Sequence, residues 1–569
     1  MAKLFATLAC LLVATSCAAL PGVTVHPTEA WKTDTELVTA IGNEPDIVDP
    51  QLSSFSSEGA IVGMLYEPLL TWDPVTLTLV PAAARELPTV SANGLVYTYT
   101  LRPGLTYSDG SPLTAQRFVD AFVRLCDPQS WAELAFIAYA IEGCGAWNGK
   151  DVKTATASEL ESARAAMGVR ALDDLRLEFR LTKPFAAFPQ ATALWIGSPV
   201  RVEDLGAPPA NVYRPVGLTK LVGNGAFTLK EWIKGDRLIF ERNERYRLPV
   251  RLARWIKRIV PDADTQRVMY DAGRIDALSV TPRNAADREA LLVRGDLARA
   301  LGACTRYVGF NTARAPFDDA NVRLAFAKAL DKEDFARSID MTGRPAASLV
   351  IHAQPGHAHD DRAQQFDAAE ARRLLASSKY GAPVEGKLAG IDLRFVFQDS
   401  PQVKVRIDWI VEQWYANLGV RVTPEVYRGW GSLIKRPEAE PHIYRLGWCE
   451  DYPDGLNWYE QFTTGASSNR THFSDKAFDA LIDQADIERD GTLRQALYER
   501  ASRVLSAAAP GAWLTWSETW WLVRPELRGY EQSSFDWDFG QFSLTRIVGM
   551  RRETGSGATN AILTPSGRG

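Results

Sequence analysis

Apolar residues recur along this chain with two different periods. Alternation with a period of two, which is typical of strands, covers residues 37–41 and 95–101 and begins again at residue 442. Helical spacing is clearest over residues 405–418, with Gly419 as the stop. The apolar face of this helix comprises Ile407, Ile410, Val411, Trp414, Tyr415 and Leu418. Strands and helices alternate along the chain, so the pattern predicts an α/β protein.

Weaker patterns fill the intervals between these segments. Thr114 and Asp319 each precede an apolar run and are suited to cap a helix. Residues 59–65 are apolar and are also expected to be helical, whereas residues 420–423 and 515–525 are expected to be strands. The tail after Arg551 is rich in Gly, Ser and Thr and is expected to be disordered. No repeat of fixed period interrupts this order.

Length and composition narrow the class of protein. At 569 residues the chain is too long for one simple core, so we expect two or more lobes. Hydrophobic residues make up 46% and charged residues 23%, and the net charge of -5 with no basic tract argues against nucleic acid as a partner. The 17 Trp residues are unusual, because large rigid rings suit binding surfaces as well as cores.

The first residues predict export. Lys3 precedes an apolar run over residues 4–14, which is too short for a membrane-spanning helix but suits the core of a signal peptide. The small residues that follow end in Cys17 and resemble a bacterial lipobox, so residues 1–17 are predicted to be a lipoprotein signal ending at a lipidated cysteine. A plain secretory cleavage nearby is the alternative. No later segment approaches a membrane span, and the remainder is predicted to be soluble.

Four cysteines remain after this leader, and three pairings of them are possible. Cys126 and Cys144 flank one short excursion and pair most simply with each other, which would leave Cys304 with Cys449. Metal binding by these residues is a poor alternative, since no Cys-x-x-Cys spacing exists.

The strand that begins near residue 442 ends in an unusual set of side chains. A Trp, a Cys, two carboxylates and a Tyr lie together just before Pro453. A carboxylate walled by aromatic rings at a strand end is suited to receive an ammonium group. The alternative is an ordinary strand end with a surface Asp. Glu450 and Asp451 could also be read as an acid/base pair, but neighbouring side chains on a strand point to opposite faces.

Other candidate chemistry is weaker. His352, His357 and His359 share a Pro/Gly-containing loop, which is either a metal site or, as we expect, a solvated loop without metal. No Gly-x-Ser-x-Gly elbow, His-Glu-x-x-His or phosphate-binding Gly loop is present, so neither catalysis nor a cofactor is predicted.

Several segments, in this order, resemble the bacterial extracellular solute-binding proteins of family 5, the peptide/nickel group that serves ATP-driven importers. They are Glu44-Pro45, Tyr66-Glu67-Pro68-Leu69, Leu101-Arg102-Pro103-Gly104, Ser108-Asp109-Gly110-Ser111-Pro112, Gly223-Asn224-Gly225-Ala226-Phe227 and Ala315-Pro316-Phe317-Asp318-Asp319. The motif Gly447-Trp448-Cys449-Glu450-Asp451-Tyr452 is most similar to the oligopeptide-binding branch.

The resemblance implies a bilobal, periplasmic-binding-protein-like α/β fold (type II, cluster C) with an extra small domain and a hinge. The expected segments are a discontinuous domain I (36–66, 190–302 and 515–545), domain II (67–189), domain III (303–514) and a disordered tail (552–569).

The resemblance also implies roles for particular residues. Asp451 would bind the α-ammonium of a peptide, Arg445 would face its C-terminal end, and the strand through Gly447, Trp448 and Cys449 would bind its main chain. Cys449 would be bonded to Cys304. Aromatic candidates to line the pockets are Tyr107, Trp430, Trp448, Tyr452 and Trp458.

The implied function is that of a monomeric, membrane-anchored lipoprotein that captures peptides and delivers them to an ABC-transporter permease. Two alternatives remain. The same fold could bind a nickel chelate, haem, an oligosaccharide or a murein peptide, or the chain could be an exported hydrolase.

Overall fold

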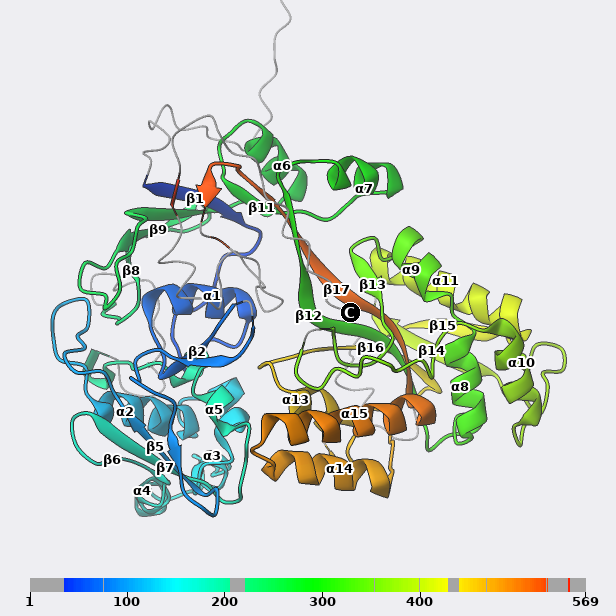
Figure 1. Ribbon diagram of the computed structural model, residues 1–569, viewed down its shortest axis with the longest axis horizontal. Helices are drawn as coiled ribbons and strands as arrows, with labels where there is room; N and C mark the ends of the chain where they lie inside the picture. Colours follow the sequence, from blue (N-terminus) through cyan, green and yellow to red (C-terminus); the bar gives the residue numbers. More distant parts are fainter. Residues whose placement is uncertain are drawn as a thin grey trace, which may run out of the picture.

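The computed structural model describes residues 35–74, 76–204, 221–352, 354–398, 400–427, 440–466, 468–528, 530 and 551–552. Its main feature is an 11-stranded mixed sheet that extends from β8 and β9 on one side of the molecule to β15 on the other (Figure 1). The strand order is β15-β14-β16-β12-β17-β11-β1-β10-β9-β8, with β13 paired to β17. The strands are β1 (Glu36–Ile41), β8 (Phe227–Ile233), β9 (Arg237–Arg242), β10 (Arg254–Ile259), β11 (Ala277–Ser279), β12 (Leu297–Phe310), β13 (Gly343–Pro345), β14 (Leu393–Gln398), β15 (Val422–Tyr427), β16 (Ile443–Cys449) and β17 (Gly511–Val523).

Two long antiparallel strands join the lobes. β12 has 14 residues and β17 has 13, and they pair along most of their length (Figure 1). Their register shifts between Leu301 and Thr305, where Gly302 lies so close to Ser517 that a Cβ atom at this position would meet its Oγ at 2.3 Å. The predicted lobe boundaries at residues 302–303 and 514–515 fall inside these two strands. The crossing segments are therefore strands of one sheet rather than free loops.

A smaller domain packs below the β1 end of the sheet. It contains the four-stranded sheet β4-β5-β7-β6 and the hairpin β2-β3. Its strands are β2 (Leu70–Trp72), β3 (Leu79–Pro81), β4 (Thr89–Val90), β5 (Val96–Thr100), β6 (Val169–Ala171) and β7 (Arg176–Arg180). The described part of the chain before β12 contains the helices α1 (Ser56–Leu65), α2 (Ala115–Cys126), α3 (Cys144–Asn148), α4 (Ala157–Ala165), α5 (Phe188–Ala191), α6 (Ala263–Asp271) and α7 (Ala285–Leu292).

The opposite lobe is built around β14, β15 and β16. Its helices are α8 (Ala320–Lys328), α9 (Lys332–Ser338), α10 (Ala368–Ser377), α11 (Pro401–Leu418), α13 (Gly455–Tyr459), α14 (Lys476–Ile487) and α15 (Gly491–Ala508). Short 3-10 turns cover Glu133–Ala138, Trp195–Gly197, Val202–Asp204 and Glu460–Phe462. Short strands β18 (Leu527–Arg528) and β19 (Arg551–Arg552) pair with each other.

The predicted elements are found at or near their expected positions. In α11 the side chains of Ile407, Ile410, Trp414 and Leu418 are buried and Gly419 ends the helix in the left-handed region, but Tyr415 is exposed. Asp319 caps α8 by accepting from the backbone of Asn321, whereas the Thr114 side chain makes no cap hydrogen bond. The strand expected at residues 420–423 begins two residues later and extends to Tyr427.

Both disulfides expected from the sequence are present. Cys126 and Cys144 join the end of α2 to the start of α3, and Cys304 and Cys449 join β12 to β16. The second pair links directly opposed residues of two neighbouring strands.

Some sequence-based expectations fall outside the described residues. These include the signal segment 1–17 with Cys17, residue Trp430, and the tail beyond Arg552. Arg552 belongs to β19 and pairs with Leu527, so the prediction of disorder is wrong for this residue. None of the helices in the described segments is sufficiently long and apolar to cross a membrane.

Candidate functional site

The last five residues of β16 form an incompletely paired edge. β16 pairs with β12 over its whole length, but β14 pairs with it only at Ile443 and Tyr444. Among the described residues, no strand is paired to residues 445–449 on the β14 side, and Gly447 and Cys449 are exposed. β14, β15 and β16 are parallel, and ligands of α/β sheets bind beyond the carboxyl ends of such strands. This edge can therefore accept main-chain hydrogen bonds from an extended ligand.

Asp451 stands just past the end of this edge. Its carboxylate is partly buried, and burial raises the pKa of Asp451 above its usual value. Asn457 of α13 donates to Oδ2 of Asp451 at 3.3 Å and accepts the backbone N–H of Asp451 at 2.9 Å. The indole of Trp448 donates to the same Asn457 oxygen at 3.3 Å. The position of Asp451 is thus fixed by a residue that the sequence motif did not reveal.

Two further carboxyl groups, those of Glu450 and Glu460, lie near enough to Asp451 to interact with it electrostatically. Glu450 is buried, its Oε2 accepts from the indole of Trp458 at 2.8 Å, and its Oε1 has no hydrogen-bond partner in the described part of the chain. Burial raises the pKa of Glu450 well above its usual value, and burial, with Asp451 nearby, raises the pKa of Glu460 to about 7. Glu450 and Asp451 lie beyond β16, which ends at Cys449, so strand alternation does not apply to them. Their side chains bind different residues of α13, Trp458 and Asn457 respectively.

Positive charge gathers at the opposite end of the edge. Arg445 donates to the neutral side chain of Gln398 at 3.3 Å and forms no ion pair with any described residue. Burial and the neighbouring guanidinium groups of Arg406 and Arg306 lower the pKa of Arg445. The edge therefore runs from a cationic end to an acidic end. Arg445 and Asp451 are six positions apart, which corresponds to at most about 20 Å of extended backbone.

The aromatic candidates lie in different environments. Trp448 is partly buried beside Asn457, whereas Tyr452 and Trp458 are buried in the core under the site. Tyr107 lies in the small domain, is fully buried, and its hydroxyl lacks a partner among the described residues. Ligand contact by these residues stays a prediction, and Trp430 is outside the described residues.

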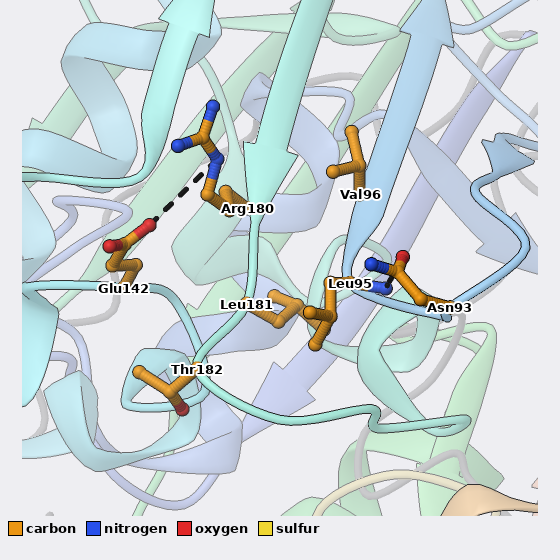
Figure 2. Close-up of a pocket in the computed structure, with 7 residues that line it drawn as sticks. All are labelled: Asn93, Leu95, Val96, Glu142, Arg180, Leu181 and Thr182. Carbon is orange, nitrogen blue, oxygen red and sulfur yellow. Dashed lines mark hydrogen bonds and ion pairs between the residues drawn. The ribbon is translucent and has the colours of Figure 1, made fainter.

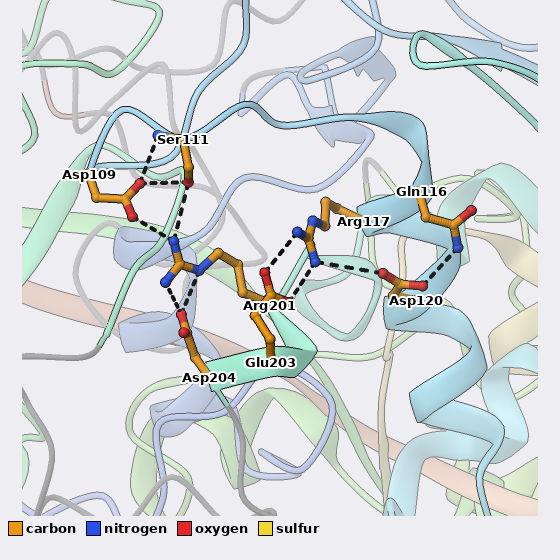
Figure 3. A network of polar contacts seen from close by, with 8 residues as sticks. All are labelled: Asp109, Ser111, Gln116, Arg117, Asp120, Arg201, Glu203 and Asp204. Atoms are coloured by element: carbon orange, nitrogen blue, oxygen red, sulfur yellow. Dashed lines mark hydrogen bonds and ion pairs between the residues drawn. The ribbon is translucent and has the colours of Figure 1, made fainter.

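A polar network holds the loop that follows Tyr107. Arg201 contacts Asp109 at 2.5 Å and also Asp204, while Arg117 binds Glu203 through two hydrogen bonds of 2.7 and 2.8 Å (Figure 3). Each arginine is matched by carboxylates, so this network fastens the loop and leaves no unmatched positive charge for a ligand.

The His-rich loop is packed rather than fully solvated. The rings of His352, His357 and His359 lie 4.9–5.8 Å apart, and His357 is buried, with Nδ1–H donating to the Val350 carbonyl at 2.8 Å. Burial lowers the pKa of His357 to about 4. Among the described residues, no group of three or more His, Cys, Asp or Glu side chains is arranged to hold a metal ion.

A separate pocket of about 500 Å³ lies at the end of the small sheet (Figure 2). Its lining residues are Asn93, Leu95, Val96, Glu142, Arg180, Leu181 and Thr182. Its two charged residues, Glu142 and Arg180, pair at 3.8 Å. The pocket contains none of the residues expected to bind a ligand.

Contacts between the small domain and the opposite lobe lie near the acidic end of the edge. Lys183 pairs with Asp486 at 3.0 Å, the backbone of Ala186 donates to the Asp486 carbonyl at 2.8 Å, and Gln190 donates to the Pro453 carbonyl at 3.4 Å. Asp486 also contributes to raising the pKa of Glu460, whereas Lys183 lowers it. A ligand at this end would therefore lie where the lobes meet.

The chain is similar in sequence to bacterial solute-binding proteins. The sequence profile described as "Bacterial extracellular solute-binding proteins, family 5 Middle" matches residues 78–470. The periplasmic murein peptide-binding protein MppA of Escherichia coli (strain K12) is 28% identical over 509 residues, covering 87% of this chain and 90% of MppA. The periplasmic oligopeptide-binding protein OppA of Salmonella typhimurium is 28% identical over 514 residues, covering 87% of this chain and 89% of OppA.

A solved structure of MppA in its unliganded open form superposes with a TM-score of 0.76 at 24% sequence identity. The match covers 92% of this chain and 98% of that one. This likeness confirms the predicted bilobal binding-protein fold.

Proposed function

This chain belongs to the bacterial extracellular solute-binding proteins of family 5, and from that premise we propose that it is the peptide receptor of an ABC importer. It captures short peptides between its lobes outside the cytoplasm and delivers them to a membrane permease. The relatives named above bind murein peptides and oligopeptides, which favours peptides as the ligand class.

The observation that carries the proposal is the edge of β16 that no described strand covers, between two ends of opposite charge. A peptide in extended form has the same two properties, because it offers main-chain donors and acceptors along its length and carries opposite charges at its ends. Its ammonium group would pair with Asp451 and its carboxylate would point toward Arg445. The peptide would then run antiparallel to β16.

The spacing suggests the length of the ligand. Arg445 and Asp451 are six positions apart along the chain, which corresponds to at most about 20 Å of extended backbone. An extended peptide advances about 3.4 Å per residue, so peptides of about three to five residues fit between the charged ends. Successive side chains of the peptide would point alternately to the two faces of the extended sheet.

Closure follows from the connection between the lobes. A ligand that contacts both lobes favours the arrangement in which they approach each other. β12 and β17 join the lobes, and the register shift near Gly302 is a suitable place for a small change of angle.

The remaining features of the proposal concern location. We propose a monomer that binds no cofactor, is not an enzyme, and is held at the outer surface of the cytoplasmic membrane by lipid on Cys17. The mature chain would thereby stay close to its permease.

Mass spectrometry of the native purified protein tests the function. Intact short peptides should be released when the protein is denatured. Calorimetry with a peptide library should show one peptide bound per protein molecule. Recovery of a nickel chelate, haem or an oligosaccharide instead would support the same fold with another solute. Turnover of added peptides would favour an exported hydrolase.

A further inference from the structure

Three arginine side chains and one buried carboxylate lie at the cationic end of the β16 edge, and two of the arginines bind that carboxylate. Asp340 follows α9 and is 2% exposed. Arg306 of β12 binds its Oδ2 at 2.9 Å, and Arg406 of α11 binds its Oδ1 at 3.1 Å. Thr515 of β17 donates to Oδ2 at 2.5 Å, so both oxygens of Asp340 are occupied. Arg445 is the third arginine of the group, and among the described residues its side chain has a hydrogen bond only to Gln398.

The three guanidinium groups lie close enough to act on one another. Arg306 opposes Gly447 across the β12–β16 pair, and Arg445 opposes Val308 two residues further along. Gly447 has no side chain, so the Arg306 side chain lies beside Arg445 on the same face of the sheet. Arg306 and Arg406 both lower the pKa of Arg445, after the larger effect of burial.

The charges in this group do not balance. Three positive groups face one carboxylate among the described residues, which leaves two formal positive charges beside the open edge. Arg306 and Arg406 each keep about a quarter of their side chain exposed (27% and 25%), so they are reachable from solvent. The C-terminal carboxylate of a peptide would supply only one negative charge.

We propose that Arg306, Arg406 and Arg445 form a subsite for a peptide whose C-terminal residue carries a second carboxylate, that is, a C-terminal Glu or Asp. This inference rests on the proposed function and adds the substrate class that the site prefers. The α-carboxylate and the side-chain carboxylate would together neutralise the two unmatched charges. Arginine suits this task because its planar group offers paired donors to each carboxylate.

Three tripeptides of similar size test the subsite without any mutation. Ala-Ala-Glu and Ala-Ala-Gln differ by one charge at the C-terminal residue, and Glu-Ala-Gln carries the same extra charge at the other end. Calorimetry at low ionic strength should show Ala-Ala-Glu binding at least about tenfold more tightly than Ala-Ala-Gln, with no gain for Glu-Ala-Gln. The ratio of the affinities for Ala-Ala-Glu and Ala-Ala-Gln should fall as salt is added, because Arg306 and Arg406 are partly exposed.

A pair of variants locates the effect. Arg406→Gln should reduce the ratio between Ala-Ala-Glu and Ala-Ala-Gln to about two or less. Arg337→Gln, an exposed arginine of α9 paired with Asp334, should leave the ratio unchanged. Equal affinity of the wild type for the two peptides, or an unchanged ratio in Arg406→Gln, would overturn the subsite and leave the peptide-binding function standing. Failure of every free-amine peptide to bind would overturn the function itself and this inference with it.

Discussion

Asn457 binds Asp451 through both ends of its amide. Its nitrogen donates to the Asp451 carboxylate at 3.3 Å and its oxygen accepts the Asp451 backbone N–H at 2.9 Å. Asn457 is itself 2% exposed and belongs to α13, which Asp454 caps. The carboxylate proposed to receive the ligand is therefore held in place before any ligand arrives, which reduces the entropy lost on binding.

The first prediction concerns this amide. Asn457→Ala removes both hydrogen bonds, so Asp451 becomes free to turn and peptide affinity should fall by about tenfold. Asn417→Ala is the matched control. The Asn417 side chain of α11 donates to the Ala329 carbonyl and to the Gln413 side chain, and neither partner belongs to β16. Calorimetry on both variants, after thermal scans show that each is folded, makes the comparison. Equal losses of affinity would contradict a local role for Asn457.

The second prediction concerns pH. The pKa of Glu460 is raised to about 7 by burial and by Asp451, and burial raises that of Asp451. A proton on either carboxyl must leave when an ammonium group binds, so affinity should fall as the pH is lowered from 7.5 to 5.5. The peptide amine, with a pKa of about 8, stays charged through this range. Glu460→Gln should flatten the profile, and an unaltered profile in this variant would count against its involvement.

The third prediction separates the two disulfides. Loss of either should lower the free energy of unfolding by about 2–4 kcal/mol. Only the Cys304–Cys449 pair lies at the end of β16, so Cys304→Ser/Cys449→Ser should also weaken peptide binding. Cys126→Ser/Cys144→Ser should leave affinity within about twofold. Urea unfolding and calorimetry distinguish the two effects, and free thiols at Cys304 and Cys449 in protein from an oxidising compartment would refute the pairing.

The fourth prediction concerns anchoring. If Cys17 is the lipidated residue, Cys17→Ser should release the protein from membranes or leave its leader uncleaved. Cell fractionation and intact-mass analysis make the test. A wild-type protein that is recovered in soluble form, begins after residue 17 and carries no acyl mass would exclude the anchor.

The elements whose patterns are local were predictable from the sequence. β16 and α11 have clear periodicity, and Gly419 occupies the left-handed position that ends α11. The disulfide between Cys304 and Cys449 was predictable because the motif fixed both residues, although 145 positions separate them. The same motif singled out Asp451, whose contact with a ligand stays a prediction.

The partners of these residues were not predictable. Asn457 and Glu460 follow Asp451 closely but belong to no periodic pattern, and their roles depend on how α13 folds back under the strand end. Asp340 and Arg406 are 66 residues apart, and only the packing of α9 and α11 on the sheet brings them together. Strand alternation could not be used to orient Glu450 and Asp451, because the regular strand stops at Cys449.

The central claim is that Asp451 pairs with the α-ammonium group of a bound peptide. The most direct measurement is a cycle of four affinities: wild type and Asp451→Asn, each with a free and an N-acetylated form of one peptide. Removal of one partner of a buried charge pair costs roughly 3–5 kcal/mol, so Asp451→Asn should weaken binding of the free peptide by more than about a hundredfold. Acetylation should weaken binding to the wild type by a similar factor and add little further loss in the variant. If Asp451→Asn binds the free peptide as tightly as the wild type does, the ammonium site is elsewhere and the account of this edge is wrong.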